Sequence, residues 1–391
     1  MSSLLDEMYE ACGAHVPHKG VLVLEDGSVF EGTAAGAEGE VFGEVCFNTS
    51  LEGYLEIITD PSYAGQVVVL TYPQIGNYGV NLDDVQSDAP ALSGLVVREL
   101  CHRPSNWRST MSLPAYLERH GVVCLEGVDT RALVRHIRET GAQRCVISTT
   151  RTDINALVAS VRASAHLEDS NQVERVSCHT VHRFELPASS RDFAQAPAAQ
   201  PEGGRKHVVA YDCGAKRSIL EQLYLAGCDV DVVPWDTPAE TVLAMNPDGV
   251  FFSNGPGDPV SVGATRAAAE QIVGKVPVFG ICLGHQMLSL AAGGTTSKLK
   301  YGHRGGNQPV QNLLTGRVEI TAQNHGFGLE FDTIGPEVEA DPTHPEAPVR
   351  MSERFGRVQL THVNLNDGTC EGIRFLDVNA FSVQYLSLIH I

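Results

Sequence analysis

The chain has 391 residues, of which 43% are hydrophobic and 19% charged, and its formal net charge is −19. These values are typical of a globular protein with room for two or three domains, and the negative charge, with no basic run to offset it, argues against a nucleic-acid binder. No apolar run reaches roughly 18 residues, which argues against a membrane span, and the acidic N-terminus argues against a signal peptide. The ten cysteines include no C-x-x-C pair, which argues against a disulfide framework or a zinc site. This cysteine usage favours a reducing, cytoplasmic compartment.

The N-terminal part of the chain predicts a domain of mixed α and β structure. Residues 1–19 carry little pattern and are expected to be an extension, and the domain itself is expected over 20–185. Two β-rich runs, Val21–Leu24 and Ser28–Glu31, flank Asp26-Gly27, and this arrangement predicts a hairpin. Further strands are expected at 41–47 and 66–71, and helices at 113–121, 129–138 and 153–163.

A change of composition predicts a domain boundary. Residues 186–205 are rich in Ala, Pro, Ser and Gly and offer almost nothing to bury, so they are expected to form a linker. From 206 to 385 apolar strands alternate with helices, at 207–211, 219–225, 229–233, 241–245, 249–252, 265–273 and 277–281. This alternation predicts an α/β fold with an open, mostly parallel sheet, whose ligands bind at the C-terminal ends of the strands.

The stretch from Val276 to Leu290 holds the candidate nucleophile. A short apolar strand ends in Gly280-Ile-Cys-Leu-Gly284, and a helix follows, which is the arrangement of a nucleophile elbow with Cys282 in place of serine. Glycines allow the backbone to approach closely there, and the helix N-terminus favours the thiolate form of Cys282. The alternative interpretation is a buried structural cysteine, since free cysteine behaves as a small hydrophobe.

A glycine-rich loop, Ser253-Asn-Gly-Pro-Gly-Asp-Pro259, leaves the neighbouring strand. It does not match a phosphate-binding motif, so no nucleotide site is expected in this chain. One of its backbone N–H groups, together with that of Leu283, is instead a candidate to hold the oxyanion of a tetrahedral intermediate. The alternative interpretation is an ordinary tight turn.

These motifs carry a family resemblance. Gly280–Gln286, the Ser253–Pro259 loop and Ala322–Phe327 together resemble a class I glutamine amidotransferase domain. Phe47–Tyr63 and Leu70–Asn77 further resemble the small, glutamine-hydrolysing chain of carbamoyl-phosphate synthase, and the likeness runs from about Gly20 to Tyr385.

The resemblance implies a catalytic residue and a glutamine site. It places the nucleophile at Cys282, whose thiolate attacks the carboxamide of glutamine so that ammonia leaves and water resolves a glutamyl thioester. The residues that it implies for glutamine binding are Ser50, Gly255, Gly257, Leu283, Gln286, Asn324, Gly326 and Phe327. Ser50 lies in the first predicted domain, so the site is expected to be completed across the domain interface.

The resemblance also implies a partner. Ammonia passes to a large chain that uses ATP and bicarbonate to make carbamoyl phosphate for the pyrimidine and arginine pathways, in a cytoplasmic heterodimer. No cofactor and no metal ion is expected in this chain, because ATP and metal ions belong to the large chain. Neither nucleic acid nor membrane is expected as a partner.

The sequence departs from the family pattern after Tyr385. The family continues with His-Pro-Glu, a base and the acid that orients it, whereas Leu386 and Leu388 stand here where the histidine and the glutamate are expected. Leu-Ser-Leu-Ile-His-Ile resembles a translated sequencing adapter, so residues 386–391 are expected to be a non-native tail on a chain cut short. This chain is then expected to hydrolyse glutamine poorly.

Three alternatives stay open at this point. Another class I amidotransferase, feeding guanylate or anthranilate synthesis, would lack residues 20–185. A catalytically impaired scaffold subunit would account for the missing His-Pro-Glu. An acid–amine hydrolase or a redox cysteine protein would share the elbow but would not explain Asn324–Phe327.

Overall fold

The computed structural model describes residues 18–151, 153–187, 204–339 and 341–386. Nearly all of the extension expected at 1–19, most of the linker expected at 186–205, and residues 387–391 of the expected tail therefore lie outside the described residues. The chain divides into two compact units. Among the described residues, the first unit comprises those up to Phe47 with Gln66–Asn81 and Leu92–Ala165, and the second comprises Asn48–Gly65, Leu82–Ala91 and those from His166 onward.

A closed β-barrel forms the first unit. Its strands follow the order β1, β2, β8, β6, β4, β3 and β9, and β9 pairs with β1 to close it. The predicted hairpin is confirmed, because β1 and β2 pair antiparallel on either side of the Asp26-Gly27 turn. The bounds are β1 Lys19–Leu24, β2 Val29–Gly36, β3 Glu40–Asn48, β4 Gln66–Leu70, β6 Gly94–Val96, β8 Val123–Glu126 and β9 Arg144–Ser148.

The three helices predicted for this region are present, and each begins at a side chain that caps it. Ser112 caps α3 (Leu113–Arg119), Asp129 caps α4 (Thr130–Thr140) and Asp153 caps α5 (Ile154–Ala163), each accepting a backbone N–H three residues on. The apolar face of α5 packs through Leu157 and Val161 against Val21, Val23 and Val146 of β1 and β9. Burial of such faces, rather than helix propensity, stabilises short helices of this kind.

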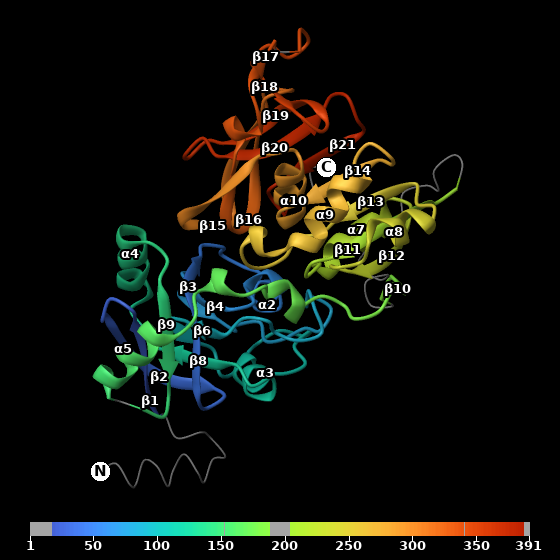
Figure 1. The fold of residues 1–391 in the computed structure, drawn as a ribbon. Helices are drawn as coiled ribbons and strands as arrows, with labels where there is room; N and C mark the ends of the chain where they lie inside the picture. The colour runs from blue at the N-terminus through green and yellow to red at the C-terminus, as the bar shows by residue number, and fades with distance from the viewer. Residues whose placement is uncertain (1–17, 152, 188–203, 340, 387–391) are drawn as a thin grey trace, which may run out of the picture. The chain divides into compact units, whose positions relative to one another are not determined.

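The second unit is built on one open sheet (Figure 1). Its parallel part runs in the order β12, β11, β13, β14 and β21, as the alternating pattern predicts. The strand bounds are β11 Lys206–Asp212, β12 Cys228–Pro234, β13 Gly249–Phe252, β14 Val278–Ile281 and β21 Ala380–Val383. The helix bounds are α7 Arg217–Leu225, α8 Ala239–Ala244, α9 Gly263–Ile272 and α10 Leu283–Ala291.

Both faces of the parallel strands are buried, because successive side chains point to opposite sides. Along β11, Val209 packs with Ile272 of α9 and Leu288 of α10, whereas Ala210 packs in the cluster that holds Ile219 of α7. This two-sided burial explains why these strands are nearly continuous apolar runs in the sequence.

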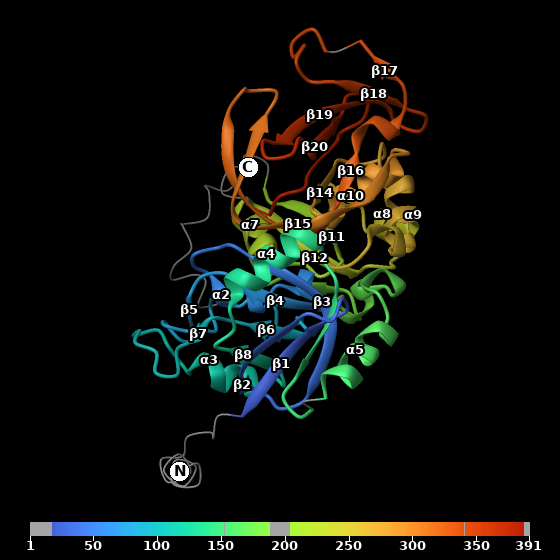
Figure 2. The ribbon, with the colours of Figure 1, turned by 90° about the vertical axis from the view of Figure 1, so that its left-hand side faces the viewer.

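The same sheet continues beyond β21 as an antiparallel extension that the strand–helix pattern does not predict (Figure 2). The order is β20, β16, β15, β19, β18 and β17. The sheet is thus parallel only in its β12–β21 part. The bounds are β15 Thr295–Asn312, β16 Val318–Glu330, β17 Glu337–Val338, β18 Val349–Ser352, β19 Gly356–Asn364 and β20 Cys370–Phe375.

Short elements complete the fold. They are α2 Tyr54–Ile58, β5 Gln74–Ile75, β7 Glu99–Leu100, β10 His182–Arg183, and the 3-10 helices Pro61–Tyr63, Leu167–Asp169, Gln172–Arg175, Pro259–Ser261 and Phe331–Ile334. Among the helices of the described ranges, none has both the length and the apolar composition that crossing a membrane requires.

Candidate active site

Cys282 lies between β14 and α10 in a backbone conformation that cysteine rarely adopts. Its φ is 54° and its ψ is −105°, and its backbone N–H donates to the carbonyl of Val383 at 2.9 Å. A positive φ costs a residue with a side chain about 1–3 kcal/mol and persists where the surroundings enforce it. The predicted strand, sharp turn and helix of a nucleophile elbow are therefore confirmed in geometry.

The glycines of the elbow permit close backbone packing. A Cβ on Gly284 would lie 2.1 Å from the carbonyl oxygen of Phe252, and one on Gly280 would lie 2.7 Å from the backbone of Gly284. Neither contact can be relieved by moving a flexible side chain, because both partners are backbone atoms. Only residues without a Cβ fit at these two positions, as the sequence predicts.

The thiol of Cys282 is buried and donates weakly to the carbonyl of Asn324, with sulfur and oxygen 3.6 Å apart. Burial raises its pKa to about 12, and the carboxylates of Asp60 and Glu371 act in the same direction. The backbone N–H of Leu283 and the side chain of Gln384 lower the pKa by smaller amounts. The helix N-terminus thus contributes as expected, but desolvation outweighs it and Cys282 is a thiol in this structure.

The glycine-rich loop lies against the first turn of α10. The N–H of Gly284 donates to the carbonyl of Ser253 at 3.0 Å, and a Cβ on Gly255 would lie 2.7 Å from the Leu283 side chain. Gly257 has a φ of 86°, which glycine accommodates without strain. Gly255 and Leu283 are therefore brought together beside Cys282, while Gly257 lies farther along the loop, next to Gln172.

Gln286 connects three elements of the site. Its Nε2 donates to the carbonyl of Phe327 on β16 at 2.8 Å and to Oε1 of Gln384, which follows β21, at 3.0 Å. Gln384 is fully buried and is a site residue that the sequence interpretation missed. The signal for it was its place after β21, the strand that pairs parallel with β14 and ends at the same edge.

Asp60 is a second site residue that was missed. Asn324 donates from Nδ2 to Oδ2 of Asp60 at 3.2 Å, and Nζ of Lys216 lies 3.7 Å from the same oxygen. All three belong to the second unit, and Asp60 is almost fully buried. The buried carboxylate is thus paired and hydrogen-bonded, which is the condition for keeping a charge in a protein interior.

Ser50 lies in the segment Asn48–Gly65, which packs with the second compact unit. The neighbouring Thr49 donates to the carbonyl of Arg304 at 3.2 Å, and Arg304 pairs with Asn324 in the β15–β16 ladder. The segment around Ser50 is therefore tied to the strand beside Asn324. On β16, a Cβ on Gly326 would come within 3.4 Å of the Arg304 guanidinium.

The histidines of these motifs are engaged elsewhere. His285 bonds through Nδ1 to the hydroxyl of Ser382 at 2.8 Å, and burial lowers its pKa to about 3. His325 bonds through Nδ1 to the carbonyl of Phe327 at 2.8 Å, and burial lowers its pKa well below the usual value. Within the described residues, no hydrogen bond joins Cys282 to a histidine. Leu386 donates its backbone N–H to Ala322, and Leu388 lies outside the described residues.

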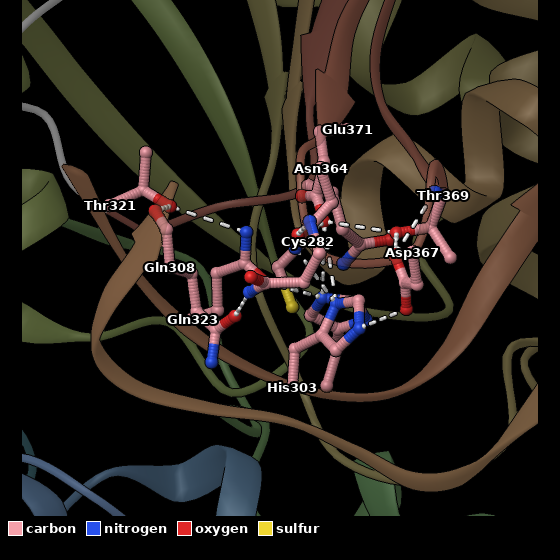
Figure 3. Close-up of polar contacts among 12 residues, drawn as sticks. Cys282, His303, Gln308, Thr321, Gln323, Asn364, Asp367, Thr369 and Glu371 are labelled. Atoms are coloured by element: carbon pink, nitrogen blue, oxygen red, sulfur yellow. Dashed lines mark hydrogen bonds and ion pairs between the residues drawn. The ribbon is translucent and has the colours of Figure 1, made fainter. Parts of the chain in front are cut away.

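Polar side chains from β15, β16 and β20 lie around Cys282 (Figure 3). Glu371 of β20 is close enough to raise the pKa of the Cys282 thiol, and it is itself fully buried. The arrangement supplies a strained thiol, the backbone N–H of Leu283 near it and a set of amide side chains. Such a set is suited to attack on a carboxamide or a similar acyl group.

Comparison with known proteins agrees with this geometry. The family model of the carbamoyl-phosphate synthase small chain, CPSase domain, matches residues 22–147, and that of glutamine amidotransferase class-I matches residues 209–385.

Carbamoyl phosphate synthase small chains are similar along almost the whole chain. Those of Syntrophotalea carbinolica and Akkermansia muciniphila are 51% and 47% identical over 94% of this chain, covering 92% and 91% of their own lengths. That of Thermotoga maritima is 44% identical over 94% of this chain and 93% of its own. The chain therefore belongs to the family of carbamoyl phosphate synthase small chains and carries a class I glutamine amidotransferase domain.

Proposed function

We propose that the chain is the glutamine-hydrolysing subunit of a carbamoyl phosphate synthase and that Cys282 is its nucleophile. The observation that carries the proposal is the strained turn at Cys282, with φ at 54°, between a parallel strand and α10. Backbone strain of this kind concentrates at functional sites. Sulfur attacks the carboxamide carbon of glutamine, the C–N bond breaks as ammonia leaves, and water then cleaves the glutamyl thioester to glutamate.

Backbone and amide groups have separate roles in this reaction. The N–H of Leu283, which already points to the sulfur, and an N–H of the Ser253–Pro259 loop hold the oxyanion of the tetrahedral intermediate. Such a donor is worth about 10²–10³-fold in rate. Glutamine is held by Ser50, Gly255, Gly257, Leu283, Gln286, Asn324, Gly326 and Phe327.

Proton transfer is the demanding part of the reaction. A thiol with a pKa of about 12 must lose its proton as glutamine binds, and the leaving ammonia must gain one. Leu386, at the position where the family resemblance expects the base, has no group that takes up a proton. We therefore expect proton transfer to limit turnover in this chain, while binding of glutamine depends on groups that are present.

The partner is a large chain that joins the released ammonia to bicarbonate with ATP, in the pyrimidine and arginine pathways. This chain is expected to carry no cofactor for glutamine hydrolysis. The nine cysteines among the described residues form no disulfide, which supports a reducing, cytoplasmic location.

Two alternatives are less well supported. Another class I amidotransferase is disfavoured because the family model for the small-chain domain matches residues 22–147. A scaffold role is disfavoured because the elbow and its strained cysteine are intact.

The test uses the complex with a large chain. In a chain that carries His-Pro-Glu at residues 386–388, Cys282→Ser should abolish carbamoyl phosphate synthesis from glutamine and leave synthesis from added ammonia unchanged, because only the ammonia source is removed. Glutamine-dependent synthesis at the wild-type rate in the variant would refute the role of Cys282. Failure of the chain to co-purify with a large chain would refute the assignment of the partner.

A further inference from the structure

Two histidines and a glutamate meet in the interior of the antiparallel extension. His303 on β15 and His325 on β16 are direct partners in the ladder, and Glu371 lies on the adjacent strand β20. One ligand atom from each lies within 4.8 Å of those of the other two, and all three side chains are buried. His303 Nδ1 is 3.4 Å and His325 Nε2 is 4.0 Å from the same Glu371 oxygen. Figure 3 shows His303 and Glu371 close together.

The hydrogen bonds outside this cluster orient both rings. Nε2 of His303 bonds to the carboxylate of Asp367 at 2.8 Å, which turns Nδ1 towards Glu371. Nδ1 of His325 bonds to the carbonyl of Phe327 at 2.8 Å, which turns Nε2 inward. A carboxylate or a backbone carbonyl on the far nitrogen is the outer support that metal-binding histidines have in proteins.

Both ring nitrogens of His325 face oxygen acceptors, and these cannot both receive a proton from a neutral imidazole. The Thr321 hydroxyl donates to the carbonyl of Gln308 at 3.0 Å, so its oxygen accepts from Nε2 of Gln323 at 3.2 Å. This fixes the Gln323 amide with Oε1 facing Nε2 of His325 at 3.2 Å. The Phe327 carbonyl and Gln323 Oε1 can both only accept, and a neutral His325 has a single N–H, so one of its two ring nitrogens faces an oxygen with no proton between them.

Glu371 adds a third unsatisfied acceptor. Its Oε1 accepts from Nδ2 of Asn364 at 3.1 Å, but its Oε2 is buried without a hydrogen-bond partner. A buried carboxylate oxygen without a donor is costly and is normally explained by a bound cation or water. The acceptor that His325 faces without a proton and the unpartnered oxygen of Glu371 are both features that a bound cation would satisfy.

We propose that His303 Nδ1, His325 Nε2, Gln323 Oε1 and a Glu371 oxygen form a binding site for one divalent transition-metal ion, of which Zn²⁺ fits best. Two imidazoles with oxygen ligands suit zinc, which prefers four ligands in a tetrahedron. Bonds of about 2.0–2.2 Å place tetrahedral ligands roughly 3.3 Å apart. The 3.2 Å and 3.4 Å separations already match this spacing, and closing the 4.0 Å separation needs a small shift of Glu371.

An acidic pocket borders the cluster at Asp367. A pocket of about 400 Å³ is lined by Asp367, which supports His303, and by Cys370, which precedes Glu371. Its lining also includes Glu330, Asp332 and Glu337, against a single arginine, Arg350. A concentration of negative charge of this kind attracts cations.

The cluster is connected to the amidotransferase residues through Phe327 of β16. The Phe327 carbonyl accepts from His325 and also from Gln286 of α10. An ion bound by His325 therefore fixes β15, β16 and β20 to one another and holds Phe327 in place for Gln286. This role is structural and does not depend on which acyl substrate Cys282 attacks.

The test titrates the chelator-stripped full chain with Co²⁺ as a spectroscopic probe and then with Zn²⁺. We expect one equivalent to bind, with visible bands of four-coordinate cobalt, no sulfur-to-cobalt band, and a rise in melting temperature. His303→Gln should weaken binding by more than about 100-fold, and Asp367→Asn, which keeps the fold of its turn, by about 10–100-fold. His207→Gln is the matched control, since His207 also pairs with an aspartate at 2.8 Å in the same unit.

Several results would overturn the proposal. These are weak, non-stoichiometric binding in the wild type, a sulfur-to-cobalt band that points to Cys370 or another thiol, or equal losses in His207→Gln. If His303→Gln does not fold, the metal affinity of Asp367→Asn and the cobalt spectrum of the wild type decide whether the site binds a metal ion. Unchanged affinity in Asp367→Asn would then mean that the cluster holds a proton or a water molecule instead of a metal ion.

Discussion

The two units differ in what they bury. The barrel buries mainly aliphatic side chains such as Leu22, Val68 and Leu95, with a few polar ones such as Glu44 and Ser148. The sheet unit buries charged and amide groups among its apolar ones, including Asp60, His285, Gln286, Asn324, Glu371 and Gln384. The candidate site residues all lie outside the barrel unit, so we expect substitutions in the barrel interior to act mainly on stability.

The polar interior of the sheet unit has a stability cost. Buried polar groups are tolerated where they are hydrogen-bonded, yet His285 Nε2, Gln384 Nε2 and Glu371 Oε2 lack hydrogen-bond partners in the described structure. Together with the strained backbone of Cys282, they mark the sheet unit as the one in which stability is given up for function. Substitutions in the two units should therefore separate activity from stability.

The largest expected effect is that of Cys282→Ser on glutamine hydrolysis. In the chain whose residues 386–388 are replaced by His-Pro-Glu, loss of the nucleophile should lower kcat by about 10⁴–10⁶-fold, because the members of a catalytic unit act together. The melting temperature should change little, since the two side chains have nearly the same shape. Cys213→Ser is the control, as Cys213 is also buried in the same unit and its sulfur contacts the hydroxyl of Thr265. A similar loss of kcat in both variants would contradict the assignment.

A gain of activity is expected when His-Pro-Glu replaces residues 386–388. Introducing a base at Leu386 should raise kcat by about 10²–10⁴-fold, the range of general acid–base catalysis, with little change in KM. Steady-state kinetics of the two chains decides the point. Equal turnover would mean that another group already transfers the proton.

Acid should destabilise the sheet unit through His285. Its folded-state pKa is about 3, below the ordinary 6.5, so as the pH falls from 6.5 towards 3 the unfolded state takes up a proton that the folded state does not. Stability is therefore lost over this window, by at most roughly 4–5 kcal/mol at 1.36 kcal/mol per pKa unit. Urea unfolding between pH 7 and pH 4 should show a smaller pH dependence in His285→Gln. An identical dependence in both chains would contradict the burial of a neutral imidazole.

The smallest effect on activity is expected in the barrel. Leu95→Ala removes a fully buried side chain from β6 and should lower the free energy of unfolding by about 2–5 kcal/mol. The kcat per folded molecule should stay within about twofold of the wild type, because no site residue is altered. A loss of kcat as large as that from a site substitution would remove the distinction between the two interiors.

The parts that could be predicted from the sequence are those whose signal is local. The Asp26-Gly27 hairpin, the parallel strands and the elbow at Cys282 each lie within a short stretch and obey one periodicity. By contrast β15 contains Gly302, Gly305, Gly306 and Pro309, which weaken any strand prediction, and its bulges break the alternation.

What could not be predicted depends on register between distant segments. Asp60 reaches Asn324, and Gln286 reaches Gln384, only because the sheet brings their strands and loops together. The cluster of His303, His325 and Glu371 has no ligand spacing of the kind that identifies a zinc site in a sequence. Its members meet because His303 and His325 are ladder partners and β20 is the next strand.

The central claim, that Cys282 attacks glutamine, is tested most directly by trapping the intermediate. The chain is mixed with glutamine, quenched in acid, digested and examined by mass spectrometry. We expect a glutamyl thioester on the peptide that contains Cys282 and none on the peptides of Cys213, Cys46 or Cys370, which are equally buried. A thioester on another cysteine, or glutamine hydrolysis in the Cys282→Ser chain at the wild-type rate, would contradict the account.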